Sequence, residues 1–281
     1  MMLPADSHVH SEYSWDTGGP DSAAAGRMVR TCERAIQIGV PSVVFSEHLD
    51  LDPWIADAED VMEHQRTMHV EGWLRPLRFQ LDRYVESVEQ CRHRFPQLRI
   101  LTGVEYGQPH RCDDRVNATV DVGALDRVNG SLHTLPFREG YAEPNTMYRH
   151  LPADEVMWSY LEEIPRMVAG SDTFSVFTHI DYAVRSWPAQ REGPFDPRCF
   201  EEGFRIAMRA IAQSGRVLEL NTRRLELWVP QWWAEEGGRA VTFGSDAHEP
   251  ENLAHRFPEA ALMAEHCGFR PGPTSEDPWT R

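Results

Sequence analysis

The chain has 281 residues, of which 41% are hydrophobic and 10% aromatic, enough for a large folded core, and this composition excludes a disordered protein. Its 44 acidic and 28 basic residues give a formal net charge of −16, which argues against binding to nucleic acid or to an anionic membrane. There is no apolar run long enough for a transmembrane helix, no secretory signal and no C-x-x-C pair among the five cysteines, so we expect a cytoplasmic protein with reduced thiols.

Hydrophobic runs that end in a histidine or a carboxylate recur along the chain. The first ends in Asp6-Ser7-His8-Val9-His10, and because residues two apart on a strand point to the same side, both histidines could reach one metal ion. Six more runs with strand composition end at His48, Glu105, His133, His179, Asn221 and His248. Apolar residues at helical spacing predict helices between them, over about 22–38, 74–94, 154–169, 197–213, 225–236 and 252–267, with a loop and a short helix at 50–70.

Strands that alternate with helices predict a parallel sheet with right-handed crossovers. Six of the seven predicted strands carry a possible metal ligand at the C-terminal end, which favours a closed barrel over an open doubly wound sheet. We therefore predict an α/β fold, a distorted (β/α)7 barrel similar to a TIM barrel, with neighbouring first and last strands and a metal site at the C-terminal strand ends. We expect a single domain over residues 1–281, with its core at about 4–270 and a loosely attached tail at 271–281.

Nine potential metal ligands lie at or near these strand ends, six imidazoles and three carboxylates. One mononuclear site needs only three or four ligands, so this supply suits two or three divalent ions with shared ligands. Mixed imidazole and carboxylate ligation favours zinc, manganese or iron over calcium or magnesium. The candidates are His8, His10, Asp16, His48, Glu105, His133, His179, Asp246 and His248.

Several short motifs resemble, in order, those of the polymerase and histidinol phosphatase (PHP) superfamily, and the histidinol-phosphate phosphatase branch is the most similar. Leu218-Glu219-Leu220-Asn221 and Gly268-Phe269 also resemble that branch, and the resemblance covers residues 4–270. The superfamily motifs are Asp6-x-His8-x-His10, Ser46-Glu47-His48, Gly103-Val104-Glu105, Gly130-Ser131-Leu132-His133, His179-Ile180-Asp181 and Gly244-Ser245-Asp246-Ala247-His248.

The resemblance implies a centre of three divalent metal ions, Zn, Mn or Fe. One ion would be held by His8, His10, Glu105 and Asp246. Glu105 would bridge to a second ion, held also by His133 and His179, and the third would be held by Asp16, His48 and His248. Asp16 stands where some superfamily members have a histidine, so the third site can differ in metal preference or occupancy.

The resemblance also implies a metal-dependent phosphomonoesterase that hydrolyses a small phosphorylated substrate, such as histidinol phosphate, by a metal-bridging hydroxide. Asp246 would be both a ligand and a proton shuttle. Arg185 after His179 would bind the phosphate, as would Arg223 or Arg224, although the branch usually has its arginine a few residues later.

Other polar and aromatic residues have weaker functional interpretations. Glu47 and Asp181 follow or precede candidate ligands and could orient them, or could be ordinary strand-end carboxylates. The tryptophans at 228, 232 and 233 have the spacing of a helix face packed on the core, which we favour over a wall for the substrate.

Three alternative functions are considered. The displaced arginines keep open a PHP phosphoesterase that acts on a nucleotide or sugar phosphate. A non-catalytic metal-binding or regulatory module is disfavoured by the complete set of ligands. An amidohydrolase-like (β/α)8 hydrolase of C–N bonds shares the His-x-His motif and the late aspartate, but it often needs a bridging lysine and this chain contains no lysine.

Overall fold

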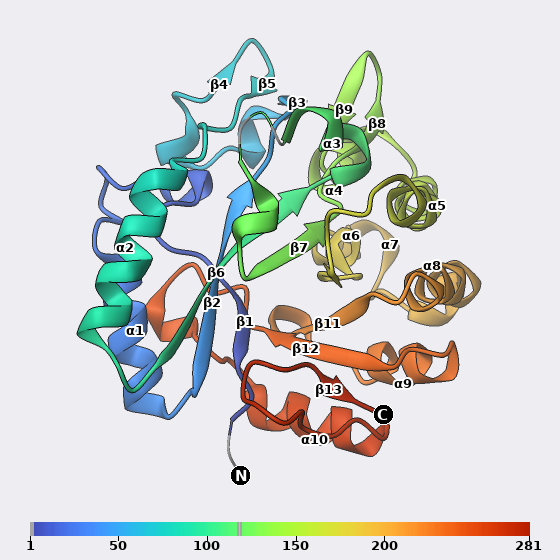
Figure 1. Ribbon diagram of the computed structural model, residues 1–281. Helices are drawn as coiled ribbons and strands as arrows, with labels where there is room; N and C mark the ends of the chain where they lie inside the picture. Colours follow the sequence, from blue (N-terminus) through green and yellow to red (C-terminus); the bar gives the residue numbers. More distant parts are fainter. Residues whose placement is uncertain (1–2, 117, 119) are drawn as a thin grey trace.

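The computed structural model describes residues 3–116, 118 and 120–281 (Figure 1). Its main sheet contains seven parallel strands, and each predicted strand corresponds to one of them. In sheet order they are β1 (Asp6–Val9), β2 (Ser42–Leu49), β6 (Arg99–Gly107), β7 (Arg127–Ser131), β10 (Val176–Phe177), β11 (Val217–Asn221) and β12 (Ala240–Gly244).

The first and last parallel strands are neighbours, as a closed barrel requires. The Asp246 N–H donates to the His8 carbonyl over 2.8 Å, and the His10 N–H donates to the Ala247 carbonyl over 2.9 Å. The buried Asp6 carboxylate reinforces this seam by accepting the N–H groups of Ser245 (3.0 Å) and Ala254 (2.9 Å). Within the described residues the seam is paired by an isolated bridge between Val9 and Ala247 rather than by a continuous ladder, so the barrel is distorted there. These contacts confirm the predicted fold.

Helices lie on the outside of the curled sheet (Figure 1). No helix in the described part of the chain is both long and apolar enough to span a bilayer. The helices are α1 (Arg27–Ile38), α2 (Leu81–Arg94), α3 (Pro109–Val116), α4 (Pro144–His150), α5 (Ala153–Gly170), α6 (Tyr182–Arg185), α7 (Ala189–Glu192), α8 (Glu201–Gln213), α9 (Trp228–Glu235) and α10 (Phe257–His266).

Helix α1 begins five residues later than the sequence predicts. Gly26 has a left-handed backbone (φ 72°), which interrupts the helical path before Arg27. The Glu12 carboxylate then accepts the N–H groups of Gly26 (2.9 Å) and Met28 (2.7 Å), so it satisfies free donors of the first turn. The first turn is therefore satisfied by Glu12, which lies outside the predicted helix.

A second, small sheet occupies the region that we predicted to be a loop and the start of a helix. Leu74, placed in a helix by its spacing, pairs instead with Trp54 in an antiparallel ladder. Helix α2 therefore begins at Leu81, not near residue 74. The strands of this sheet are β4 (His69–Val70), β5 (Trp73–Leu74), β3 (Trp54–Ile55), β9 (Gly140–Ala142) and β8 (Leu135–Phe137).

The C-terminal segment is held more firmly than the loosely attached tail that we expect. Strand β13 (Trp279–Thr280) pairs antiparallel with β12. The Trp279 side chain is buried and packs edge-on against Phe243, with ring centroids 4.9 Å apart. A large aromatic side chain that leaves water in this way anchors the segment.

Helix α9 packs on the core as its tryptophan spacing predicts. Trp233 is fully buried and its indole N–H donates to the Ala240 carbonyl over 3.0 Å. Trp232 is also buried, and Trp228 packs against Phe204 at a centroid distance of 4.6 Å. The three tryptophans therefore contribute packing on the outside of the barrel.

Candidate metal centre

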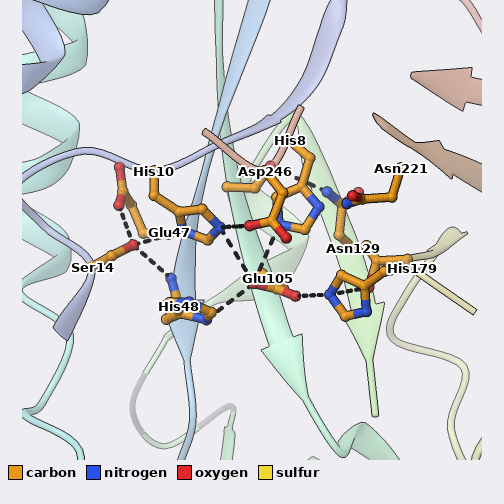
Figure 2. A network of polar contacts seen from close by, with 12 residues as sticks. His8, His10, Ser14, Glu47, His48, Glu105, Asn129, His179, Asn221 and Asp246 are labelled. Carbon is orange, nitrogen blue, oxygen red and sulfur yellow. Dashed lines mark hydrogen bonds and ion pairs between the residues drawn. The ribbon is translucent and has the colours of Figure 1, made fainter. Parts of the chain in front are cut away.

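The nine predicted ligands meet at the C-terminal mouth of the barrel. Figure 2 shows Glu105 at the centre, with His8, His10, His48, His179 and Asp246 around it. Glu105 is 1% exposed and comes from β6, in the middle of the parallel sheet. Its carboxylate oxygens face five imidazoles, at nitrogen–oxygen distances of 3.3 Å to His8, 3.5 Å to His10, 3.0 Å to His48, 2.9 Å to His133 and 2.5 Å to His179.

The other two carboxylates lie on either side of this group. Asp246 Oδ1 is 3.4 Å from His10 Nε2, and Asp246 adopts a left-handed backbone (φ 54°) that is uncommon outside glycine. Asp16 Oδ2 is 2.6 Å from His248 Nε2 and 3.5 Å from His48 Nε2. The structure therefore brings all nine residues together.

Potential ligand atoms fall into four overlapping groups, in each of which they lie within 4.8 Å of one another. Overlap means that one side chain could serve two neighbouring ions. One group also contains Asp50, which the sequence did not single out. The groups are His8, His10 and Asp246; His8, Glu105 and His179; His10, His48 and His248; and His48, Asp50 and His133.

The proton of His8 is fixed on the nitrogen that faces away from Glu105. His8 Nδ1 lies 2.7 Å from Glu219 Oε2, and both side chains are buried. Burial raises the pKa of Glu219, but His8 and other hydrogen-bond donors lower it below its usual value. Glu219 is therefore an ionised carboxylate and can only accept a hydrogen bond. His8 Nδ1 therefore donates, and the lone pair on Nε2 faces the other ligands, as metal-binding histidines require.

A two-step relay fixes the proton of His10 in the same way (Figure 2). The Ser14 hydroxyl donates to Glu47 Oε2 over 2.6 Å, so its oxygen accepts from His10 Nδ1 over 2.9 Å. His248 shows the same pattern, with Nδ1 3.1 Å from the Asp246 carbonyl. With Nδ1 engaged in this way, Nε2 of each of these three histidines is the nitrogen that could bind a metal ion.

The electrostatics of the site favour bound positive charge. Burial would raise the pKa of Asp16, Glu105 and Asp246, but nearby imidazoles and Arg185 hold each pKa well below its usual range. Burial lowers the pKa of His133, yet Glu105 and Asp50 raise it to about 9. The ionised carboxylates therefore carry negative charge that divalent ions bound by these residues would neutralise.

Several buried polar atoms of the cluster have no hydrogen-bond partner within the described residues. Such atoms are costly to bury unless an ion satisfies them. His248 Nε2 is the clearest case, because it lies close to Asp16 without the geometry of a hydrogen bond. The residues thus fit a metal centre, and the unpartnered atoms are Asp16 Oδ1, His48 Nδ1, Glu105 Oε2, His179 Nδ1 and His248 Nε2.

Arg185 brings a fixed positive charge to the same mouth. It lies in the short helix α6 rather than in a loop, and its Nη1 donates to Asp246 Oδ2 over 2.7 Å. Its Nε and Nη2 are buried and lack a partner among the described residues, so two donors remain for an anion.

The two later arginines occupy different positions. Arg223 lines the central cavity, with Nη1 3.7 Å from Asp246 Oδ2. Arg224 lines a neighbouring hollow, and its Nη1 donates weakly to the Val184 carbonyl over 3.5 Å. Arg223 is therefore the better placed of the pair to reach a group bound at the metal centre.

Most of the residues that orient the ligands were not predicted from the sequence. Glu219 lies within a strand rather than at its end, although it points to the same side as Asn221 two residues later. Asp50 lies just after β2, 3.4 Å from His133 Nδ1, and is held by the Trp15 indole N–H over 3.0 Å. Glu47 does orient a ligand, as expected, but it acts through Ser14.

Replacing Glu219 by glutamine is expected to weaken metal binding by about 10- to 100-fold. Glu219 Oε1 accepts from Asn221 Nδ2 (2.8 Å) and from the His179 N–H (3.3 Å), so these donors would keep the amide oxygen of Gln at that position. The amide nitrogen would then face His8 Nδ1 and force the proton onto Nε2, which removes the ligand lone pair. Metal titration of the apo-protein measures this, and an affinity equal to the wild type would contradict it.

Replacing Gly244 by alanine is expected to damage the centre without removing a ligand. A Cβ at this position would lie 2.5 Å from Glu219 Oε2 and 2.7 Å from His8 Cβ, so the pair would have to separate. We expect a loss of metal affinity of about tenfold or more, in the range seen when an orienting contact is lost. Gly123→Ala is the control, since among the described residues the nearest atom to its Cβ would be Asp121 Oδ1 at 3.3 Å. Equal metal content in the two variants would refute the argument.

Comparison with known proteins agrees with this geometry. The PHP domain model matches residues 6–223. Similar proteins include a "Probable histidinol-phosphatase" of Clostridium acetobutylicum, 26% identical over 95% of this chain and 94% of that protein, and a histidinol-phosphatase of Bacillus subtilis, 22% identical over 95% and 100%. The fold matches the crystal structure of histidinol phosphate phosphatase from Lactococcus lactis in complex with Zn, L-histidinol and phosphate, with a TM-score of 0.75 and 21% identity over 96% of this chain and 95% of that one. The chain therefore belongs to the PHP domain family.

Proposed function

We propose that the protein is a metal-dependent phosphomonoesterase that hydrolyses L-histidinol phosphate to L-histidinol and inorganic phosphate. The observation that carries the proposal is the convergence of imidazole lone pairs and ionised carboxylates on one cavity that Arg185 also lines. The names of the similar proteins from Clostridium acetobutylicum and Bacillus subtilis support this substrate, as do the ligands in the Lactococcus lactis structure.

The nine ligands would hold three divalent ions, with zinc supported by the similar structure and manganese or iron as alternatives. His8, His10 and Asp246 form one compact group. Asp16 lies 3.5 Å from His48 and 2.6 Å from His248, which would hold another ion with it. Glu105 lies between His8 and the pair His133 and His179, where a bridging carboxylate belongs. When bound, such ions lower the pKa of water and neutralise phosphoryl oxygens.

The residues of the chain then have distinct tasks. Arg185 offers two unpartnered N–H groups to the phosphoryl oxygens, and Arg223 adds positive charge at the cavity wall. Asp246 is held in place by Arg185 and by its left-handed backbone, so its carboxylate can take the proton of the attacking water and pass it to the leaving alcohol. Glu47, Asp50 and Glu219 keep the histidines in the required orientation.

A panel of phosphate esters tests the substrate. The metal-replete protein should show a kcat/KM for L-histidinol phosphate that is about 100-fold or more above that for a nucleoside monophosphate, a sugar phosphate and an aryl phosphate. If the aryl phosphate is hydrolysed as well as L-histidinol phosphate, the substrate is wrong. If no ester releases phosphate above a metal-free control, the phosphatase activity itself is wrong.

We also propose that the enzyme works in the cytoplasm. All five cysteines are free thiols, and three of them are buried. Free buried thiols are typical of a reducing compartment.

A further inference from the structure

The cavity that contains the metal centre is lined by residues of both charges. It has a volume of about 290 Å³. Arg185, Arg223 and Asp246 line it, and so do Glu143, Asn145 and residues of the small sheet. A substrate whose phosphate is held by the arginines would therefore find an acidic side chain, Glu143, in the same cavity as its alcohol part.

Five acidic residues line the cavity, and four of them are already engaged. Asp16, Glu105 and Asp246 belong to the candidate metal centre. Asp60 accepts from Thr146 Oγ1 over 2.8 Å and pairs with Arg149 Nη2 over 2.5 Å, so its charge is neutralised within the protein. Glu143 is the fifth, and among the described residues no basic side chain forms an ion pair with it.

Glu143 is held in a defined position beside the centre. It immediately precedes α4, and Tyr182 donates its hydroxyl to Glu143 Oε1 over 2.7 Å. The Tyr182 ring lies 4.9 Å from the His133 ring and 5.1 Å from the His179 ring, centroid to centroid. Tyr182 thus spaces the carboxylate one aromatic ring away from the metal ligands.

The second carboxylate oxygen of Glu143 is available to a cationic hydrogen-bond donor. Its Oε2 carries no hydrogen bond from the described residues, and the side chain is only partly buried because it faces the cavity. Burial raises the pKa of this carboxyl group by more than the Tyr182 hydroxyl lowers it. An ammonium group would supply the missing positive charge and a charge-assisted hydrogen bond.

We propose that Glu143 is a specificity residue that binds the primary ammonium group of an amino-alcohol phosphate. This inference rests on the proposed phosphatase function and deepens it, because it names the part of the substrate that the enzyme distinguishes. The metal centre and the arginines bind any phosphate monoester, whereas Glu143 selects esters whose alcohol carries a positive charge near the phosphate.

The test compares L-histidinol phosphate with its des-amino analogue, 3-(imidazol-4-yl)propyl phosphate, which differs only in lacking the amine. The wild type should prefer the amine by roughly 10- to 100-fold in kcat/KM, the worth of a hydrogen bond between charged groups. Glu143→Gln keeps the size of the side chain and an acceptor for Tyr182, and it should abolish most of that preference.

Glu163→Gln is the matched control, because Glu163 is a buried glutamate that does not line the cavity. The preference of this variant for the amine should equal that of the wild type. A Glu143→Gln protein with the wild-type preference, or a Glu163→Gln protein that loses it equally, would overturn the inference. A wild type that does not distinguish the two esters would overturn it without any variant. A wild type that hydrolyses neither would instead refute the proposed function.

Discussion

Replacing Glu105 by glutamine is expected to reduce phosphate release by roughly 10³-fold or more, the cost of losing a central charge-stabilising group, and to lower the number of bound metal ions. Both oxygens of this carboxylate face imidazole nitrogens: His133 and His179 lie near Oε1, and His8 and His48 near Oε2. In glutamine, one of the two positions becomes an N–H donor. Whether this N–H group takes the place of Oε1 or of Oε2, it would donate to imidazole nitrogens whose lone pairs the metal ions need. The negative charge of the carboxylate that bridges the ions would also be lost.

Glu163→Gln is the matched control for this experiment. Glu163 is also a buried glutamate next to a histidine, with Oε1 2.9 Å from His110 Nε2, but it joins α5 to α3 away from the cavity. His110 and Arg166 lower the pKa of Glu163 to about 2 although burial opposes them. This variant should lose some stability to unfolding and keep its metals and its turnover. If Glu105→Gln behaves like Glu163→Gln, Glu105 does not bridge the centre.

Replacing Asp246 by asparagine is expected to lower kcat by about 10²- to 10⁴-fold, the usual contribution of a positioned proton-transfer group. Asp246 is buried, pairs with Arg185 over 2.7 Å and lies 3.4 Å from His10 Nε2. Burial raises its pKa, but Arg185 and the neighbouring histidines bring it well below the usual range, so the carboxylate is ionised before a proton arrives.

The two roles of Asp246 can be separated by adding excess metal. As a ligand alone, Asp246→Asn would weaken metal binding, and saturating metal would restore full turnover. As a proton carrier as well, it would leave kcat low even when metal analysis shows the centre to be full. Steady-state kinetics across a metal titration measures both, and complete recovery of kcat would remove the proton-transfer role.

The barrel and the nine converging residues could be predicted because both follow from local sequence. After β1, each strand that ends in a candidate ligand follows a helix, and in a parallel barrel such ends lie at one mouth. The predicted neighbours β1 and β12 meet through the Asp246 and His10 backbone N–H groups. No single histidine indicates a metal site by its sequence alone. The position that the histidines share, at the ends of predicted strands, is what indicates the site.

The small sheet could not be predicted because its strands are too short to carry a pattern. Strands β3 and β5 have two residues each and pair with each other. β5 also pairs with β4, and β3 pairs with β9, which lies far along the chain. Tertiary pairing overrides the helical spacing of Leu74 there.

The residues that orient the ligands could not be predicted, for a different physical reason. Glu219, Ser14 and Asp50 contact their histidines across 211, 4 and 83 positions of sequence, and only Ser14 is local. A hydrogen bond between distant elements leaves no periodic trace. Glu143 and Tyr182 likewise come from loops and helix starts that the barrel brings to one cavity wall.

The cluster of imidazoles and carboxylates is expected to bind divalent ions that make phosphate-ester hydrolysis possible. The measurement is phosphate release from L-histidinol phosphate by metal-free protein to which Zn²⁺ or Mn²⁺ is returned in measured equivalents. We expect no release above background without metal, and a rise to a plateau at about two to three equivalents per chain, as a multinuclear site requires. Equal release by the metal-free protein, or no release at any metal content, would show that the cluster is not a hydrolytic metal centre.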